Sequence, residues 1–382
     1  MSSVSAIDLR PQTRRSRPDL VLIGITAALS ALGLLMILST SGPRLEAAGL
    51  GRNSQMVRQA IYVGLGAGVL IVTSLVSDRV WKLAAPYYYA GMIVLLLAVL
   101  SPIGALRQGA QRWISLGLFD LQPSEVAKVG VILALALMLA PVEEGRMKWL
   151  RLLKVGALVG FPSIFIFLQP DLGTMLVFGF VTFAMLFVAG TTVRQLVMLI
   201  VLALIALGIA VELDLLRGYQ LERLEGFFNP NEQTLQVNYN QNQSQIAIGS
   251  GGMFGQGLFE GSQTNLAFVP AQTTDFIFTA VAEQLGFVGG TLVIGLYAAL
   301  IWRILMVAAI ARDRFGQLAA TGIAAMFGFH VFVNIGMAVG LLPVTGLPLP
   351  FLSFGGSFYL AMAVSVGIVN SIWMTRSPVP RN

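Results

Sequence analysis

Residues 20–41 read LVLIGITAALSALGLLMILSTS, a run without a charged side chain. An α-helix needs about twenty consecutive apolar residues to cross the ~30 Å hydrocarbon core of a bilayer, and this run is long enough. Arg14, Arg15 and Arg17 precede it, as basic residues precede a signal peptide, but no small-residue cleavage pattern follows. The stretch therefore predicts a first membrane-spanning helix and not a signal peptide.

The rest of the chain shares this apolar character. Of its 382 residues, 56% are hydrophobic and 11% are charged, with a mean hydropathy of +0.79. A soluble domain carries about 25% charged residues, so the composition predicts a polytopic membrane protein. The formal net charge is +6, but the basic residues lie in short loops and indicate topology, not nucleic-acid binding. Cysteine is absent and the single histidine, His330, lies in an apolar run, so we expect no disulfide and no His-based metal site.

Further apolar runs of spanning length predict helices at 59–77, 83–101, 123–141, 152–169, 172–190, 194–213, 284–310, 317–341 and 351–374. The turn between 152–169 and 172–190 is predicted from Gln169-Pro170-Asp171, because a proline and a charge do not face lipid in mid-bilayer. The predicted fold is an all-α polytopic membrane protein of about ten transmembrane helices. These helices form one domain over residues 1–382.

The distribution of Lys and Arg predicts the orientation of these helices. Most of the 24 basic residues fall on the side of the two chain ends, and cytoplasmic loops carry such an excess. The tails 1–19 and 375–382 are therefore predicted to be cytoplasmic. The long polar segment 214–283, between the seventh and eighth helices, is predicted to be extracytoplasmic.

A carboxylate stands at the membrane edge of this long loop, in Thr274-Asp275-Phe276-Ile277-Phe278. A partly desolvated Asp275 would be a better base near neutral pH, which makes it a catalytic candidate. The alternative is that Thr274 or Asp275 caps the following helix, as short polar residues often do. Glu283 lies ~80° away around a helix, so it is poorly placed as a paired acid and equally suits a structural bond.

A second polar group joins the third and fourth helices. Arg112 carries a planar fork suited to phosphate oxygens. Pro123 predicts a helix start, with Glu125 near its positive end. Lys128 is predicted either to bind a ligand or to pair with Glu125 at i,i+3, and pairing is the favoured role of Glu125.

Two segments combine glycine or proline with polar residues. Residues 243–252 read QSQIAIGSGG, whose turns could hold a pyrophosphate or sugars, although the phosphate-loop pattern is missing. The tract 229–245 is alternatively disordered. Residues 341–357 are too rich in proline for a regular helix and predict an outer linker or an unwound helix lining a cavity.

These segments together resemble the SEDS family of bacterial membrane glycosyltransferases, over nearly the whole chain. The resemblance lies in five motifs in order, GAQRW at 109–113, QPSE at 122–125, QPDLGT at 169–174, TDFIF at 274–278 and PVTGLPLPFLSFGGS at 343–357. Residues 247–252, AIGSGG, are more similar to the elongation member RodA than to the division member FtsW.

The resemblance implies that the chain polymerises lipid II into glycan strands during elongation, beside a class B penicillin-binding protein and other elongation machinery. It implies that Asp275 is the essential carboxylate of the family. We hypothesise that Asp275 takes a proton from an acceptor sugar of the lipid-linked glycan while undecaprenyl pyrophosphate leaves. Arg112, Lys128 and Arg223 are then expected to stabilise the leaving group. The other expected substrate-binding residues are Gln111, Glu125, Gln243, Ser244 and Ser357.

Residues 267–273 depart from the family, because they lack the glutamates and histidine of many relatives. No metal ligands are therefore predicted, and assistance by Mg²⁺ or Mn²⁺ stays open. Two other functions also stay open, a flippase for a lipid-linked precursor and a non-catalytic scaffold for a transpeptidase.

Overall fold

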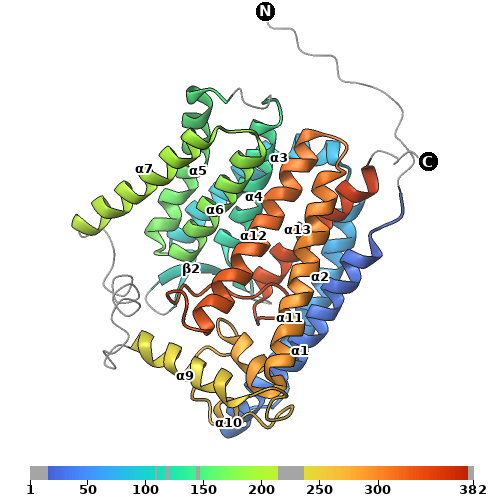
Figure 1. Ribbon diagram of the computed structural model, residues 1–382, viewed down its shortest axis with the longest axis vertical. Helices are drawn as coiled ribbons and strands as arrows, with labels where there is room; N and C mark the ends of the chain where they lie inside the picture. Colours follow the sequence, from blue (N-terminus) through green and yellow to red (C-terminus); the bar gives the residue numbers. More distant parts are fainter. Residues whose placement is uncertain (1–15, 108–109, 118–119, 143–146, 214–235, 377–382) are drawn as a thin grey trace, which may run out of the picture.

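The computed structural model describes residues 16–107, 110–117, 120–142, 147–213 and 236–376 (Figure 1). The chain is mainly helical. The helices before the long loop are α1 (Leu20–Ala47), α2 (Ser54–Leu75), α3 (Asp78–Leu100), α4 (Pro123–Leu139), α5 (Trp149–Leu168), α6 (Leu172–Val188) and α7 (Val193–Glu212). Those after it are α9 (Gln236–Ser250), α10 (Ser262–Asn265), α11 (Ile277–Ala309), α12 (Arg314–Ala338) and α13 (Gly356–Thr375).

Seven of the described helices are long and apolar enough to span a membrane, namely α1, α2, α3, α5, α11, α12 and α13. The helices α4 and α6 have 17 residues each, and the apolar part of α7 covers Val193–Ala206. Multiple membrane spans are thus confirmed within the described residues, whereas the number ten stays a prediction.

Local chemistry explains where several helices begin. The Asp19 carboxylate accepts from the backbone N–H groups of Val21 and Leu22 at the start of α1. Asp171 caps α6 in the same way through Thr174 N–H, 3.1 Å away. These bonds satisfy donors that a helix N-terminus leaves unpaired. The predicted turn at 169–171 therefore lies between α5 and α6.

The interior of the bundle is built from α4, α12 and α13. Most of the side chains on these helices are buried, and α12 contacts α4, α6, α11 and α13. By contrast, α2, α5 and α7 expose most of their apolar side chains, as helices that face lipid do. Polar residues on α4 and α12 are therefore held away from lipid.

The all-α prediction is wrong between α3 and α4, where a small antiparallel sheet forms. Its strands are β1 (Gly104–Arg107), β2 (Ala110–Ser115) and β3 (Asp120–Leu121), in the order β1-β2-β3. Ile114 pairs with Gly104 on one side and Leu121 on the other. Trp113 and Ile114 favour extended backbone. The strands were not predicted, because each is too short to show a clear alternation of apolar and polar residues.

The long loop after α7 contains ordered helix. Residues 214–235 lie outside the described part, but 236–245 belong to α9, so a disordered state is wrong for this part of the tract. The eighth predicted helix begins at Ile277 and not at residue 284. Figure 1 shows α9 and α10 packed at the end of the bundle where α11 begins.

Close backbone packing explains the glycines after α9. A Cβ on Gly251 would lie 2.0 Å from Ala282 O, and one on Gly255 would lie 2.1 Å from Gln284 O. They pack against a non-helical kink in α11 at Gly286, whose φ is +67°. Two backbone donors of this segment bond carbonyls beside the kink, Gln256 N to Glu283 O at 3.0 Å and Gly257 N to Gln284 O at 3.1 Å. The described glycine-rich segment is therefore a packing element.

Candidate functional site

Asp275 lies immediately before α11, with a partly exposed side chain and a tightly held backbone. Its N–H donates to Ala271 O at 3.0 Å, and its carbonyl accepts from Asn334 Nδ2 at 2.7 Å. Phe276 is the N-cap residue of α11, without a side-chain cap bond. The structure therefore does not give Asp275 or Thr274 the N-cap position considered from the sequence.

The proline-rich segment 343–355 holds the residues before Asp275 in place. Phe354 N–H donates to Thr273 O at 2.9 Å, and the Ser353 hydroxyl donates to Thr274 O. This segment precedes α13 without forming a helix, which confirms the predicted break in the membrane helix. The proline-rich segment thus bonds the carbonyls of Thr273 and Thr274 directly. The next carbonyl, that of Asp275, is bonded by Asn334 of α12.

Two polar residues of α12, one turn apart, hold this segment in turn. Asn334 Nδ2 donates to Leu347 O at 2.7 Å as well as to Asp275 O. His330 Nδ1 lies 3.0 Å from Pro348 O. Both side chains are fully buried. Neither residue was predicted from the sequence to have a role in the site, although their i,i+4 spacing in an apolar stretch of α12 was a usable signal.

His330 also reaches a buried ion pair on α4. Lys128 Nζ lies 2.7 Å from Glu125 Oε2 and 3.2 Å from His330 Nε2. An ammonium group only donates, so Nε2 accepts and the Nδ1–H donates to Pro348 O. The pairing of Glu125 with Lys128 is as the i,i+3 spacing predicted. Lys128 is fully buried within this cluster.

Strand β2 contacts the turn between α5 and α6 through Arg112. Arg112 donates from Nε to Gln169 O at 2.8 Å and from its guanidinium to Pro170 O. Gln111 Nε2 donates to Ser101 O and Gly104 O at 2.7 and 2.9 Å. Both residues therefore shape the backbone around the predicted site.

Two serine hydroxyls connect α4 to its neighbours. Ser124 Oγ donates to Asp171 Oδ2 at 3.1 Å, and Ser357 Oγ accepts from Gln122 N–H at 2.9 Å. Because Ser357 follows the proline-rich segment, the five motifs form one connected set of hydrogen bonds. Residues far apart in sequence, at 110–117, 120–125, 169–174, 274–278 and 343–357, thus meet at one end of the bundle.

The polar residues of α9 mainly cap α12. Ser244 Oγ donates to Ala338 O at 2.7 Å, and Gln241 Nε2 donates to Met337 O at 3.2 Å. The last carbonyls of a helix have no partner within it, so these donors satisfy them. Gln243 lies beside Ser244 with a partly buried side chain. Arg223 lies outside the described residues.

Glu283 has the structural role considered from the sequence. Its carboxylate accepts from Gln263 N at 2.6 Å and from Thr264 N and Oγ1 at 3.2 and 2.6 Å. It ties α10 to α11 and is fully buried. Among the described residues, no three or more of His, Cys, Asp and Glu gather into a possible metal site. The described carboxylate and imidazole side chains therefore do not form a closed metal site.

An apolar groove of about 410 Å³ lies between α11 and α12. Its lining is almost entirely apolar and includes Ile294, Phe332, Leu341 and Leu342. Such a lining suits a hydrocarbon chain or an apolar helix face, not a sugar. Asp275 is not among its lining residues.

The sequence and fold match known proteins over almost their whole length. A model for FtsW/RodA/SpoVE cell cycle proteins matches residues 19–377. The chain is 36% identical to the peptidoglycan glycosyltransferase MrdB of Escherichia coli K12, covering 95% of each chain. It is 35% identical both to a probable peptidoglycan glycosyltransferase FtsW of Trichlorobacter lovleyi, covering 95% of each, and to stage V sporulation protein E of Bacillus subtilis, covering 94% of this chain and 98% of that one.

Solved structures agree with this result. A chain from a peptidoglycan synthase complex superposes with a TM-score of 0.79 at 32% identity, covering 93% of this chain and 97% of that chain. The rod shape determining protein RodA of Thermus thermophilus gives 0.69 at 30% identity, covering 95% and 98%. Relatives of the FtsW and MrdB types are about equally similar, so the preference for RodA stays a prediction. The chain belongs to the FtsW/RodA/SpoVE family, the SEDS proteins that its five motifs resemble.

Proposed function

We propose that the protein is an inverting peptidoglycan glycosyltransferase that polymerises lipid II at the outer face of the bacterial cytoplasmic membrane. The observation that supports this most is the placement of Asp275. Its side chain is partly exposed, whereas its backbone and that of the two preceding residues are bonded to α12 and to the proline-rich segment. A rigidly placed base at a lipid–water boundary suits chemistry on a lipid-linked substrate.

In the proposed reaction, an Asp275 carboxylate oxygen takes the proton from the 4-hydroxyl of the acceptor sugar. The 4-oxygen of the acceptor sugar then attacks the anomeric carbon of the other lipid-linked sugar. The bond from this carbon to undecaprenyl pyrophosphate breaks, with inversion at the carbon. The pyrophosphate carries away the negative charge, which cationic groups would stabilise. Because the described residues do not fit a closed metal centre, no step is assigned to a cation.

The remaining predicted residues are proposed to have three kinds of role. Arg112 and Arg223 are proposed to lie near the leaving pyrophosphate, with Gln111 and Gln243 near the sugars. Lys128, Glu125 and Ser357 are proposed to act on the substrate through the proline-rich segment, since their contacts lead to it. Ser244 is proposed to position α9 beneath the substrate.

A class B penicillin-binding protein is the proposed partner. The support is the likeness to a chain of a peptidoglycan synthase complex in which polymerization is coordinated with crosslinking. Co-purification of the two membrane proteins and a rise in glycan synthesis on mixing them would test the pairing. A role in cell elongation is proposed from residues 247–252.

The test of the enzymatic proposal is glycan synthesis from lipid II by the purified protein with its partner, resolved on a gel. General-base assistance contributes about 10²–10⁴-fold, so Asp275→Asn is expected to make almost no polymer. Glu260→Gln, on the exposed part of the same loop, is the matched control and is expected to retain activity. Full polymer from Asp275→Asn would exclude Asp275 as the base.

The rivals predict different results. A flippase would move a lipid-linked precursor across vesicles without polymerising it. The buried charges on α4 are paired and the described groove is apolar, which disfavours a polar path. A scaffold for a transpeptidase would retain its function in cells when Asp275 is replaced.

A further inference from the structure

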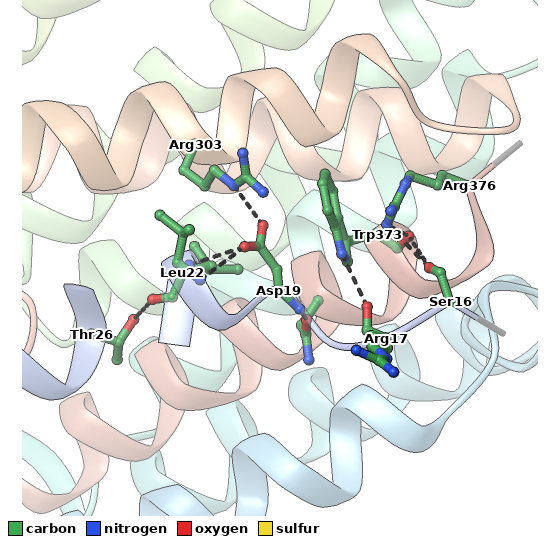
Figure 2. Close-up of polar contacts among 10 residues, drawn as sticks. Ser16, Arg17, Asp19, Leu22, Thr26, Arg303, Trp373 and Arg376 are labelled. Atoms are coloured by element: carbon green, nitrogen blue, oxygen red, sulfur yellow. Dashed lines mark hydrogen bonds and ion pairs between the residues drawn. The ribbon is translucent and has the colours of Figure 1, made fainter. Parts of the chain in front are cut away.

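Two guanidinium groups flank one tryptophan at the end of the helices opposite Asp275. The Arg303 guanidinium carbon lies 4.4 Å from the Trp373 ring centroid and that of Arg376 lies 3.5 Å from it. Figure 2 shows Trp373 between the two arginines, with Arg17 and Asp19 beside them. The cluster joins the start of α1 to the last turns of α11 and α13.

This cluster carries more positive than negative charge. Asp19 Oδ2 accepts from Arg303 Nε at 2.7 Å, and Asp19 Oδ1 caps α1. Arg376 instead donates to neutral groups, Ser16 Oγ at 3.1 Å and Trp373 O at 2.7 Å. Within the part of the chain that the structure describes, the guanidinium groups of Arg303 and Arg376 thus lie beside one carboxylate, which is already engaged. Arg17 joins the cluster through its backbone carbonyl, which accepts from Trp373 Nε1 at 3.2 Å, and its side chain is exposed.

The surroundings of Arg376 oppose its positive charge. Burial lowers the pKa of the Arg376 guanidinium, nearby Asp19 raises it, and nearby Arg303 lowers it further. The charged form is therefore opposed both by partial loss of water and by a like charge. A bound anion would relieve both effects, and guanidinium groups match phosphate oxygens bidentately.

Exposed apolar residues adjoin members of the cluster along the chain. Leu20, which follows Asp19, is 74% exposed, and Trp302, which precedes Arg303, is 68% exposed. On a membrane helix such residues face lipid, and tryptophan is enriched at the level of the headgroups. An occupant of the cluster would therefore have a phosphate group at the arginines and hydrocarbon beside Leu20 and Trp302.

We propose that Arg303 and Arg376, which flank Trp373, bind the phosphate headgroup of an anionic phospholipid, and that the exposed side chain of Arg17 adds a positive charge beside them. Basic pockets between transmembrane helices on the cytoplasmic side bind such headgroups, and the basic residues assign this end of the helices to that side. The lipid connects the ends of α1, α11 and α13, and its site is separate from the site of glycan synthesis. The proposal does not depend on the enzymatic one.

The test is quenching of Trp373 fluorescence in the full-length protein, reconstituted in phosphatidylcholine vesicles. Brominated phosphatidylglycerol or brominated phosphatidylcholine is added, and the quenching of Trp373→Phe is subtracted to isolate this residue. Each basic residue near an anionic surface contributes roughly fivefold in binding. Phosphatidylglycerol is therefore expected to half-quench Trp373 at an at least fivefold lower mole fraction than phosphatidylcholine.

Removing charge from the cluster should abolish this preference. Arg17→Gln with Arg376→Gln is expected to bring the two mole fractions close together. Arg17→Gln alone is the safeguard against misfolding, because this side chain is exposed, and it should reduce the preference about fivefold. The matched control is Arg194→Gln, at an exposed position at the start of α7, which should leave the preference unchanged.

Three results would overturn the proposal. The first is equal quenching by the two lipids in the wild-type protein. The second is an equal loss of preference in Arg194→Gln, since general surface charge would then explain the effect. The third is complete displacement of phosphatidylglycerol by inorganic phosphate at matched ionic strength, which would make free phosphate the ligand.

Discussion

His330 and Asn334 connect the buried interior of the bundle to the backbone of Asp275. His330 lies between the Lys128–Glu125 pair and Pro348 O, while Asn334 bridges Leu347 O and Asp275 O. Buried carbonyls left without a donor are costly, so each bond fixes the segment strongly. Neither side chain needs to touch substrate in order to position Asp275, the proposed general base.

His330→Leu should therefore lower kcat by about tenfold or more, because small misplacements of a catalytic group slow the reaction strongly. KM should change little, since the bonds of His330 are to Lys128 and Pro348. His330→Gln, which retains a donor and an acceptor, should recover part of the rate. Steady-state kinetics of lipid II polymerisation would check this, and a changed KM at constant kcat would argue for direct contact with substrate.

Ser244→Ala separates a structural role from a sugar-binding role. Losing the bond to the buried Ala338 carbonyl should cost about 1–3 kcal/mol of stability and lower the Tm. KM for lipid II should stay near that of the wild type. Thermal unfolding in detergent, together with kinetics, would check both outcomes, and a raised KM at unchanged Tm would contradict the structural assignment.

At the scale of elements, the kink in α11 requires glycines on the segment that packs against it. A Cβ on Gly251 would clash with the backbone of α11. A Cβ on Gly249, two residues earlier, would have no atom within 4 Å. Gly251→Ala should reduce folded protein severely, since backbone cannot move aside. Gly249→Ala should be neutral or stabilising by about 1 kcal/mol, because alanine favours a helix. Yield and Tm of the matched pair would check this, and equal stability would contradict the packing.

The elements also show what the sequence could reveal. Apolar runs located the helices, because lipid permits few other structures and the runs are long enough to span a bilayer. The strand Ala110–Ser115 and the helix α9 were missed, since one is short and the other is polar. The helix α9 is stabilised by capping the carbonyls of α12, which depends on tertiary contacts that local pattern does not contain.

The site was predictable to a similar extent. The Glu125–Lys128 pair was predicted from its i,i+3 spacing, and the structure confirms it. Residue type left two interpretations of Asp275 open, and its catalytic role stays a prediction that rests on the family resemblance. The contributions of His330 and Asn334 became visible only when α12 was placed against residues 343–355, since each bonds a backbone carbonyl from a distant segment. Arg112 looked like a phosphate ligand, but part of its hydrogen-bonding capacity holds the turn at 169–170.

At the scale of the whole molecule, the proposed orientation can be tested by labelling, because the natural chain has no cysteine. Glu260→Cys lies on the exposed loop at the Asp275 end, and Lys148→Cys lies at the exposed start of α5. A membrane-impermeant maleimide should label Glu260→Cys in intact spheroplasts and Lys148→Cys only after lysis. The reverse pattern would place Asp275 in the cytoplasm and contradict the proposed topology.

A structure of the protein bound to a non-hydrolysable lipid-linked acceptor would test the role of Asp275 most directly. The distance to measure joins the Asp275 carboxylate to the 4-hydroxyl oxygen of the acceptor sugar. Proton transfer predicts about 2.6–3.2 Å, or one bridging water, with Asn334 still bonded to the Asp275 carbonyl. An acceptor bound with this hydroxyl beyond the reach of Asp275 and facing another base would contradict the mechanism.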